Sequence, residues 1–484
     1  MKIIFLLLFL VQSVCAQIHP SIHQIEYNLH KDIPKQASLF KSSQRIIPLN
    51  IMKPAGPTKT VFGYLPDWEY TNAKEHLQYS LLSHIAAFDF TVAPNGNIST
   101  PSYWPWTDVI NKAHENGVKV IMTAVNFTAD EIHAILTNTS IKNNFFNQVK
   151  TTIQTWDLQG VNIDFESLHE ADRGSVLNSF MNELTTFIHS EISGSEVSFA
   201  GPAVNWGGWD LKGLSEACDY IFIMAYSFAG SWSSKTGANS PLEGGSINIT
   251  NTVDIQYKDV LNSHPEKLIL VVPYYGNRWQ TETIHAHSNT IDFINSPRFR
   301  TAQEESINHD KFWDNTSQSP WYRYTENSKN YQVWYDDKKS IELKYDLADE
   351  RSLKGIGMWA LGYDGDRDEL WDLLYDRYGN PTNIQTPDHL PLKVRIGQNY
   401  PNPCRFSSCI PYYLKQKSRI MLRVFEASGR IVFQKQITKQ APGEHVIKMD
   451  FENLAPGIYL YQMQIHNLLS WDVYQKTYKI QIVR

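Results

Sequence analysis

Eight short apolar runs, separated by stretches with helical periodicity, constrain the fold of this 484-residue chain more than any other feature. Residues 172–192, between the fourth run and the fifth, have the length and spacing of a helix. Strands that alternate with helices are typical of a parallel sheet, so the pattern predicts an α/β fold, an eight-stranded (β/α)8 TIM barrel over residues 59–380. The runs are residues 61–64, 84–90, 118–124, 160–166, 197–203, 220–226, 268–274 and 355–361.

The seventh and eighth runs are unusually far apart in the sequence. The residues between them, about 280–350, mix polar and aromatic side chains without one clear period. We expect them to form a small α+β insertion that walls one side of the barrel mouth.

The N-terminus has the features of a targeting segment. Lys2 precedes an apolar run at residues 3–11, and small residues follow before Gln17, as at a signal-peptidase site. The run is too short to span a membrane, and no later stretch is long and apolar enough, so we expect a signal peptide at residues 1–16 and an exported, soluble mature protein. Residues 17–58 are polar and without clear periodicity, which predicts a leader or linker with order beginning at Thr58.

The last part of the chain, residues 392–484, has a different pattern. Short alternating runs are separated by turn signals such as Ser428-Gly429 and Pro456-Gly457. This pattern predicts a small antiparallel β-sandwich. The runs are residues 420–426, 430–436, 444–449 and 457–465.

The fourth run of the predicted barrel carries three polar residues at a spacing of two: Asn162, Asp164 and Glu166. Side chains alternate between the two faces of a strand, so these three share one face and the apolar residues between them share the other. Barrel enzymes carry their chemistry at the C-terminal ends of the strands. Glu166, at the end of the row, is therefore expected at the barrel mouth.

Charge and composition exclude some functions. The formal net charge of −6 gives no electrostatic reason to expect binding to nucleic acid. The 16 histidines form no cluster with metal-ligand spacing, and we expect no metal or other cofactor. Cys404 and Cys409 are close enough in sequence to form a disulfide in an oxidising compartment, whereas Cys218 is expected to be a buried thiol.

Residues 158–166 resemble the fourth-strand signature of glycoside hydrolase family 18, the chitinase family, whose pattern is D-G-x-D-x-D-x-E. Further segments resemble family motifs in the same order along the chain. They are Met224-Ala225-Tyr226, Gly230-Ser231-Trp232, residues 236–242, Pro273-Tyr274-Tyr275-Gly276, Tyr335-Asp336-Asp337 and Gly357-Met358-Trp359-Ala360-Leu361.

The resemblance implies a retaining glycosidase in which the acetamido group of the substrate is the nucleophile, so that one acid suffices. Glu166 would be the general acid and later the base, Asp164 would raise its pKa and stabilise the oxazolinium nitrogen, and Tyr226 would orient the acetamido oxygen. Trp359 would form the floor under the sugar ring. The other residues expected to line the substrate site are Met224, Asn162, Tyr64, Phe88, Asn126, Trp232 and Ser227.

Several positions depart from the family pattern. Gln159 and Asn162 replace two acids, so neutral amides stand where charges would lie beneath Asp164. Ser227 stands where many members have an aspartate, and the third run ends in Asn126, which is expected to face the mouth. These changes point away from a standard chitinase more than away from catalysis, because the acid Glu166 is present.

The C-terminal part is similar to the sorting domain of type IX secretion. The resemblance is carried by residues 398–403, Gly429-Arg430 and residues 453–459. It implies a partner in the type IX secretion machinery and a secreted or cell-surface location; a carbohydrate-binding sandwich is the alternative for this unit.

The sequence thus predicts hydrolysis of β-1,4 bonds in glycans that contain N-acetylglucosamine, with chitin or chitooligosaccharides as the first candidates. Peptidoglycan or the N-glycan core is the alternative substrate within the family. From another class of function, a chitin-binding lectin without turnover stays open.

Overall fold

The structure is a computed structural model that describes residues 19–39, 45–50, 56–379, 394–414, 417–426, 428–451, 454–467 and 473–483. The chain divides into two compact units, residues 1–387 and 388–484. The expected signal peptide, residues 1–16, lies outside the described residues. None of the helices in the described ranges is long and apolar enough to cross a membrane.

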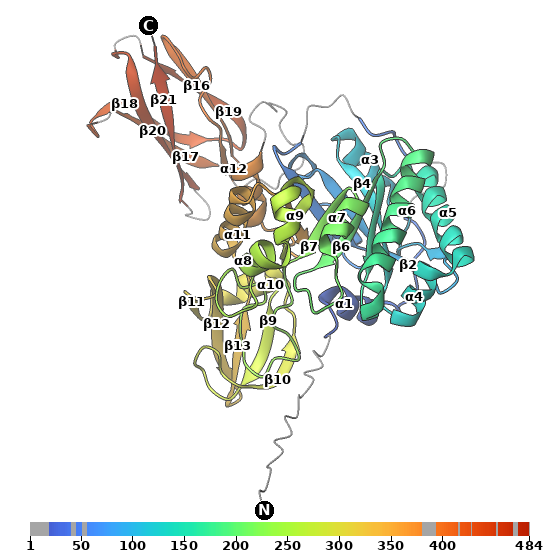
Figure 1. The fold of residues 1–484 in the computed structure, drawn as a ribbon. Coiled ribbons are helices and arrows are strands. Elements are labelled where there is room, and N and C mark those ends of the chain that lie inside the picture. The colour runs from blue at the N-terminus through green and yellow to red at the C-terminus, as the bar shows by residue number, and fades with distance from the viewer. Residues whose placement is uncertain are drawn as a thin grey trace, which may run out of the picture. The chain divides into compact units, whose positions relative to one another are not determined.

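The first unit is a closed parallel barrel, which confirms the predicted fold (Figure 1). Its strands follow the order β1-β14-β8-β7-β6-β5-β4-β2, and β1 also pairs with β2, which closes the ring. The eight strands lie within a few residues of the predicted runs because each is an apolar, buried segment. They are β1 (Thr60–Pro66), β2 (His84–Val92), β4 (Lys119–Asn126), β5 (Gly160–Phe165), β6 (Glu196–Pro202), β7 (Tyr220–Met224), β8 (Leu268–Pro273) and β14 (Gly355–Trp359).

Helices cover the outside of the barrel. The helix predicted at residues 172–192 is α6 (Ser175–Glu191), and it packs with α5 (Thr139–Trp156) over β5. The outward side chain of Phe165 lies between Phe145 and Phe180 of these helices, at ring distances of 5.9 and 6.2 Å. This layer holds β5 in place with its polar face turned inward. The remaining longer helices are α3 (Thr107–Glu115), α4 (Ala129–Thr137), α7 (Leu211–Ala217), α9 (Lys258–Ser263), α11 (Lys338–Glu350) and α12 (Glu369–Tyr378).

The insertion between the last two barrel strands is an antiparallel sheet in the order β10-β9-β13-β12-β11, with helix α10 (Phe299–Ser306). The expected range of about 280–350 extends too far, because α11 contacts β8 and β14 and is a helix of the barrel itself. The insertion strands are β9 (Asn277–Thr281), β10 (Thr290–Asn295), β11 (Asp310–Asp314), β12 (Ser319–Glu326) and β13 (Lys329–Trp334).

The second unit consists of two antiparallel sheets around its own apolar core, as the alternating runs predicted. One sheet has the order β15-β16-β19 and the other β18-β17-β20-β21. Cys404 and Cys409 are both free thiols, so the disulfide considered from the sequence is not formed, and Cys218 is buried as expected. The strands are β15 (Val394–Ile396), β16 (Ser407–Leu414), β17 (Ser418–Phe425), β18 (Ile431–Gln440), β19 (Gly443–Asp450), β20 (Gly457–Asn467) and β21 (Val473–Ile482).

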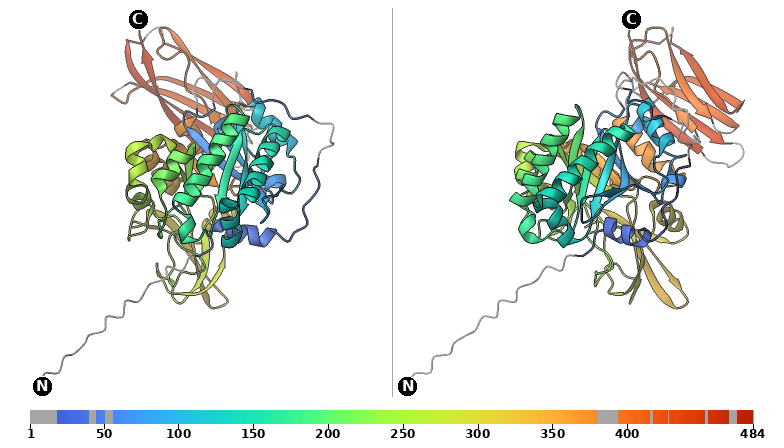
Figure 2. Two further views of the ribbon diagram at one scale, coloured as in Figure 1. Left: turned by 45° about the vertical axis from the view of Figure 1, so that its right-hand side comes forward. Right: turned by 90° about the vertical axis from the view of Figure 1, so that its right-hand side faces the viewer.

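Among the described residues before β1 there is one helix, and the expectation that order begins at Thr58 is wrong for this part of the leader. Helix α1 (Ile22–His30) lies at one end of the barrel, close to the insertion (Figures 1 and 2). Ser21 caps it, because its hydroxyl oxygen accepts a hydrogen bond from the amide of Gln24 at 3.1 Å. The helix is held by contacts with residues far along the chain, which local sequence periodicity does not report.

Candidate active site

Strand β5 places Asn162, Asp164 and Glu166 as the alternation of side chains along a strand predicts. Asn162 and Asp164 are fully buried on the inner face of the barrel, and Glu166 follows directly after the strand. The amide of Glu166 donates a hydrogen bond to the carbonyl of Asn126 at 3.1 Å, which continues the pairing of β5 with β4 beyond the strand end. The carboxyl group of Glu166 is therefore held at the C-terminal end of the barrel.

Asn162 acts as a support beneath Asp164. Its Oδ1 accepts a hydrogen bond from the hydroxyl of Tyr64 at 2.5 Å, and its Nδ2 donates one to Oγ of Ser198 at 2.9 Å. Tyr64 in turn packs edge-on against the indole of Trp359, at a ring distance of 5.4 Å. The amide thus joins three strands by neutral hydrogen bonds where the family pattern has an acid.

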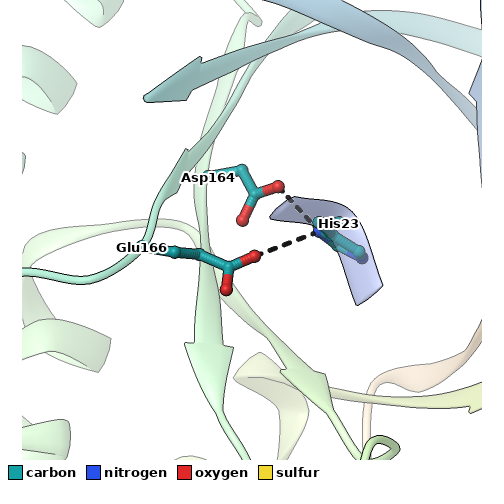
Figure 3. Close-up of side chains that lie close together, drawn as sticks. All are labelled: His23, Asp164 and Glu166. Atoms are coloured by element: carbon teal, nitrogen blue, oxygen red, sulfur yellow. Dashed lines mark hydrogen bonds and ion pairs between the residues drawn. The ribbon is translucent and has the colours of Figure 1, made fainter. Parts of the chain in front are cut away.

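The imidazole of His23, from α1, occupies the centre of the site (Figure 3). Its Nδ1 is hydrogen-bonded to Oδ2 of Asp164 at 2.7 Å, and its Nε2 is hydrogen-bonded to the hydroxyl of Tyr226 at 2.7 Å. Oε1 of Glu166 lies 3.5 Å from Nδ1. The ring stacks on Trp359 with 3.7 Å between the ring centroids, so one flat polar group touches all four of these residues.

The residue at the cap of α1 reaches the same site. The hydroxyl of Ser21 donates a hydrogen bond to Oε1 of Glu166 at 2.7 Å. Within the described part of the chain, Oδ1 of Asp164 and Nε1 of Trp359 are buried without a hydrogen-bond partner. The site therefore retains one acceptor and one donor that a ligand could satisfy.

Burial shifts the pKa values of Asp164, Glu166 and His23. It raises the pKa of Asp164 to about 8, and burial together with the neighbouring Asp164 charge raises the pKa of Glu166 to about 8. Burial also lowers the pKa of His23 to about 4, although the charge of Glu166 opposes this shift. A carboxyl group that stays protonated at neutral pH can act as a general acid.

The other residues predicted to line the site lie at different places. Phe88 packs edge-on against Trp359 at 4.9 Å, and Trp232 stacks on the ring of His19 at 4.7 Å. Met224 is half-buried at the end of β7. The hydroxyl of Ser227 is hydrogen-bonded to that of Tyr275 at 3.0 Å.

Asn126 is buried at the end of β4, but its side chain serves the loop that follows. Its Nδ2 donates to the carbonyl of Val92 and to Glu131, and its Oδ1 accepts from the amide of Thr128. Gln159 lies before β5, where its Oε1 accepts from the amide of Val120 and is hydrogen-bonded to His114. The side chains of these two residues hold neighbouring segments of the barrel, and Asn126 pairs with Glu166 through its backbone carbonyl alone.

Sequence reasoning missed the residues of α1 and two acids beside them. Asp67 directly follows β1 and Asp89 lies in the C-terminal half of β2, and both accept hydrogen bonds from the ammonium group of Lys35, at 2.7 and 3.0 Å. Their positions toward the C-terminal ends of two barrel strands are a signal that could have found them. Nothing local in the sequence pairs Lys35 with either.

His23, Asp164 and Glu166 also form a cluster that could hold a metal ion, because their ligand atoms lie within 4.8 Å of one another. Both nitrogens of His23 already take part in hydrogen bonds with protein groups, and Ser21 bonds to Glu166. The arrangement is therefore accounted for by hydrogen bonding alone.

Residues 60–364 match the family described as Glycosyl hydrolases family 18. The chain belongs to glycosyl hydrolase family 18. The match spans all eight barrel strands and the insertion, and residues 398–473 match a second family, the secretion system C-terminal sorting domain. Both matches agree with the resemblances seen in the sequence.

Relatives and solved structures of family 18 resemble the first unit. The putative sporulation-specific glycosylase YdhD of Bacillus subtilis is 27% identical over 315 residues, which are 61% of this chain and 69% of that protein. Human di-N-acetylchitobiase is 26% identical over 302 residues, 54% of this chain and 74% of the relative. The fold is similar to that of a GH18 chitinase from Cycas revoluta in complex with (GlcNAc)3, with a TM-score of 0.58 and 19% identity, covering 66% of this chain and 99% of that one. It is also similar to the spore cortex-lytic enzyme SleL of Bacillus cereus, with a TM-score of 0.56 and 21% identity over 67% and 76% of the two chains.

Proposed function

We propose that this family 18 glycosidase hydrolyses β-1,4 bonds next to N-acetylglucosamine by substrate-assisted catalysis, with Glu166, Asp164 and Tyr226 as its catalytic residues. The observation that carries the proposal is the convergence of these three groups on one small ring above Trp359. The imidazole of His23 stands in for the acetamido group of a sugar. With hydrogen on Nδ1, the ring offers a donor to Asp164 and an acceptor to Tyr226, as an acetamido N–H and oxygen would.

In the proposed reaction Glu166 first acts as an acid. It gives its proton to the glycosidic oxygen while the acetamido oxygen attacks the anomeric carbon, so the bond to the leaving sugar breaks and an oxazolinium ring forms. The Tyr226 hydroxyl holds the acetamido oxygen in line for this attack, and the Asp164 carboxylate accepts the hydrogen bond of the now positive nitrogen. Glu166 then takes a proton from water, the water oxygen opens the ring at the anomeric carbon, and the product keeps its configuration.

The raised pKa of Glu166 supports its assignment as the acid. Burial raises the pKa of this group, which favours the protonated form that proton donation requires. Asp164 is suited to the second role, because its Oδ1 is buried with no partner among the described residues and can turn to a ligand.

Chitin or chitooligosaccharides are our first candidates for the substrate. The similarity to the solved chitinase from Cycas revoluta concerns the fold alone, and relatives from three Bacillus species are named cortical fragment-lytic enzyme. Peptidoglycan is therefore the second candidate.

The test is hydrolysis of chitotetraose and of purified peptidoglycan by the complete protein and by Glu166→Gln. We expect the substitution to lower kcat about 10²- to 10⁴-fold, the usual contribution of a general acid. Glu183→Gln, on the outer face of α6, is the matched control and should keep full activity. Equal rates for Glu166→Gln and the unchanged protein would contradict the mechanism. Binding of chitotetraose without turnover of any glycan would favour the lectin alternative.

We also propose that the second unit directs the protein to the type IX secretion machinery and that residues 1–16 are a signal peptide. The match of residues 398–473 to a secretion sorting domain supports the first of these roles. Removal of residues 392–484 in a bacterium that has this machinery should retain the protein inside the cell envelope. Unchanged export would contradict the assignment.

A further inference from the structure

We propose that residues 19–38 are a built-in competitive inhibitor, which occupies the substrate cleft and keeps the enzyme latent until it is displaced. The proposal rests on the glycosidase function proposed above. Its basis is the position of α1, whose residues bond to each of the three proposed catalytic groups.

The segment and a substrate need the same atoms. Oδ2 of Asp164 and the hydroxyl of Tyr226 are both engaged by His23, and Oε1 of Glu166 is engaged by Ser21. With the segment in place, Asp164 is fully buried and Tyr226 is 4% exposed. A glycan cannot reach these groups while His23 is present.

Three histidines of the segment cover three tryptophans. His19 lies on Trp232 with 4.7 Å between the ring centroids and 7° between the planes. His23 lies on Trp359 at 3.7 Å and 29°, and His30 lies on Trp68 at 4.3 Å and 7°. Flat aromatic faces are the surfaces on which sugar rings stack. The imidazoles of residues 19–30 therefore cover tryptophan faces at three separate places.

The far end of the segment is anchored by charge. Lys35 bonds to Asp67 and Asp89, which are 5% and 2% exposed. Beyond it, the amide of Gln36 donates to Oγ of Ser102 at 2.8 Å, and the carbonyl of Gln36 accepts from the amide of Tyr103 at 2.8 Å. The segment is thus held at the catalytic centre and at a second point beside it.

The segment has the properties of a ligand more than those of a structural element. Helix α1 has nine residues, and an isolated helix of this length is marginal in water. Only Ile22 and His23 of the helix are buried, so its order depends on contacts with the cleft. A tethered ligand has an effective concentration on the order of millimolar, which makes modest affinity enough for occupancy. Such a competitor raises the apparent KM and leaves kcat unchanged.

The decisive variant is His23→Ala in the complete chain, because it removes two hydrogen bonds and one stacked ring. We expect the apparent KM for chitotetraose to fall at least about tenfold, with kcat within about twofold of the unchanged protein. Leu29→Ala is the matched control, since Leu29 is on the same helix and is 67% exposed. It should leave both constants unchanged.

Hydrogen exchange of the backbone amides of α1 gives a readout that needs no substrate. We expect these amides to be protected in the unchanged protein and in Leu29→Ala, and to exchange faster in His23→Ala. Fast exchange in the unchanged protein would overturn the proposal, as would faster exchange in His23→Ala with no change in KM. If His23→Ala removes the protection but no glycan is hydrolysed, docking of the segment in the cleft is supported. The proposed glycosidase function is then contradicted.

Discussion

The ring of His23 lies on the indole of Trp359, with 3.7 Å between the ring centroids and 29° between the planes. The indole is fully buried by this and neighbouring contacts. A residue of the leader thus occupies the aromatic floor of the barrel mouth, and the structure is that of a filled site. A substitution near the site can therefore change activity in two ways, through catalysis or through docking of the leader on Trp359.

Tyr226→Phe should remove the hydrogen bond proposed to orient the acetamido oxygen. In the His23→Ala background, where docking no longer contributes, we expect kcat/KM for chitotetraose to fall about 10²- to 10³-fold, as for loss of one donor to a reacting oxygen. Tyr275→Phe is the control, because that hydroxyl bonds to Ser227 and its ring lies 6.3 Å from that of Tyr226. An equal loss in both variants would contradict the specific role of Tyr226.

Lys35→Glu should weaken docking of the leader. The substitution places a third negative charge beside Asp67 and Asp89, which now share the ammonium group. We predict a lower apparent KM for chitotetraose and faster hydrogen exchange in α1. Lys31→Glu carries the same change of net charge at an exposed position and should have neither effect. If the two variants behave alike, the contact with the two acids does not hold the segment.

The contribution of His23 to docking should be complete above about pH 6.5 and lost in acid. The groups facing His23 are Asp164, Glu166, Tyr226 and Tyr64, and burial raises the pKa of both tyrosines so that they stay neutral. The pKa of docked His23 is about 4, below its ordinary 6.5, so its contribution is complete above pH 6.5 and is lost as the pH falls towards 4.

The carboxyl groups of Asp164 and Glu166 change the strength of docking with pH in the direction opposite to His23. In the docked state the pKa of Asp164 and of Glu166 is raised to about 8. Docking buries both groups, which favours the protonated form, so their contribution to docking is lost as the pH rises through 8. The carboxyl groups are present in both proteins, so the ratio of the apparent KM of the unchanged protein to that of His23→Ala isolates the contribution of the histidine. We expect this ratio to fall by up to about tenfold per pH unit below 6.5. The same acid-side change in both proteins would show that another group is responsible.

Asn162→Ala should destabilise the barrel, because it leaves the buried hydroxyls of Tyr64 and Ser198 without their amide partner. We expect a loss of about 1–3 kcal/mol in the free energy of unfolding, measured by urea titration. Thr123→Val is the control on the paired strand position, since the Thr123 hydroxyl is buried and has no partner within the described residues. It should be neutral or stabilising, and a loss equal to that of Asn162→Ala would contradict this account.

The sequence predicts the barrel well because its strands are apolar and its helices are periodic, and both are local signals. The row of Asn162, Asp164 and Glu166 is predicted for the same reason, since alternation alone assigns its face. The role of His23 could not be predicted in this way. Its partner Asp164 is 141 positions away, and the contact depends on how the whole barrel mouth is built.

Two features of the leader do carry a local signal. Ser21 followed by Gln24 is typical of a helix start, and Ile22, Ile25 and Leu29 have helical spacing. They indicate a short helix, although neither shows where it docks. The limits of the insertion were missed for a related reason, because α11 can be assigned to the barrel only from its contacts with β8 and β14.

The configuration of the first product tests the central claim most directly. Hydrolysis of chitotetraose by the His23→Ala protein can be followed by proton NMR before the anomers equilibrate. Attack by the acetamido oxygen and then by water inverts the anomeric carbon twice, so the account predicts that the β-anomer appears first. Initial release of the α-anomer would contradict substrate-assisted catalysis at Glu166 and Asp164.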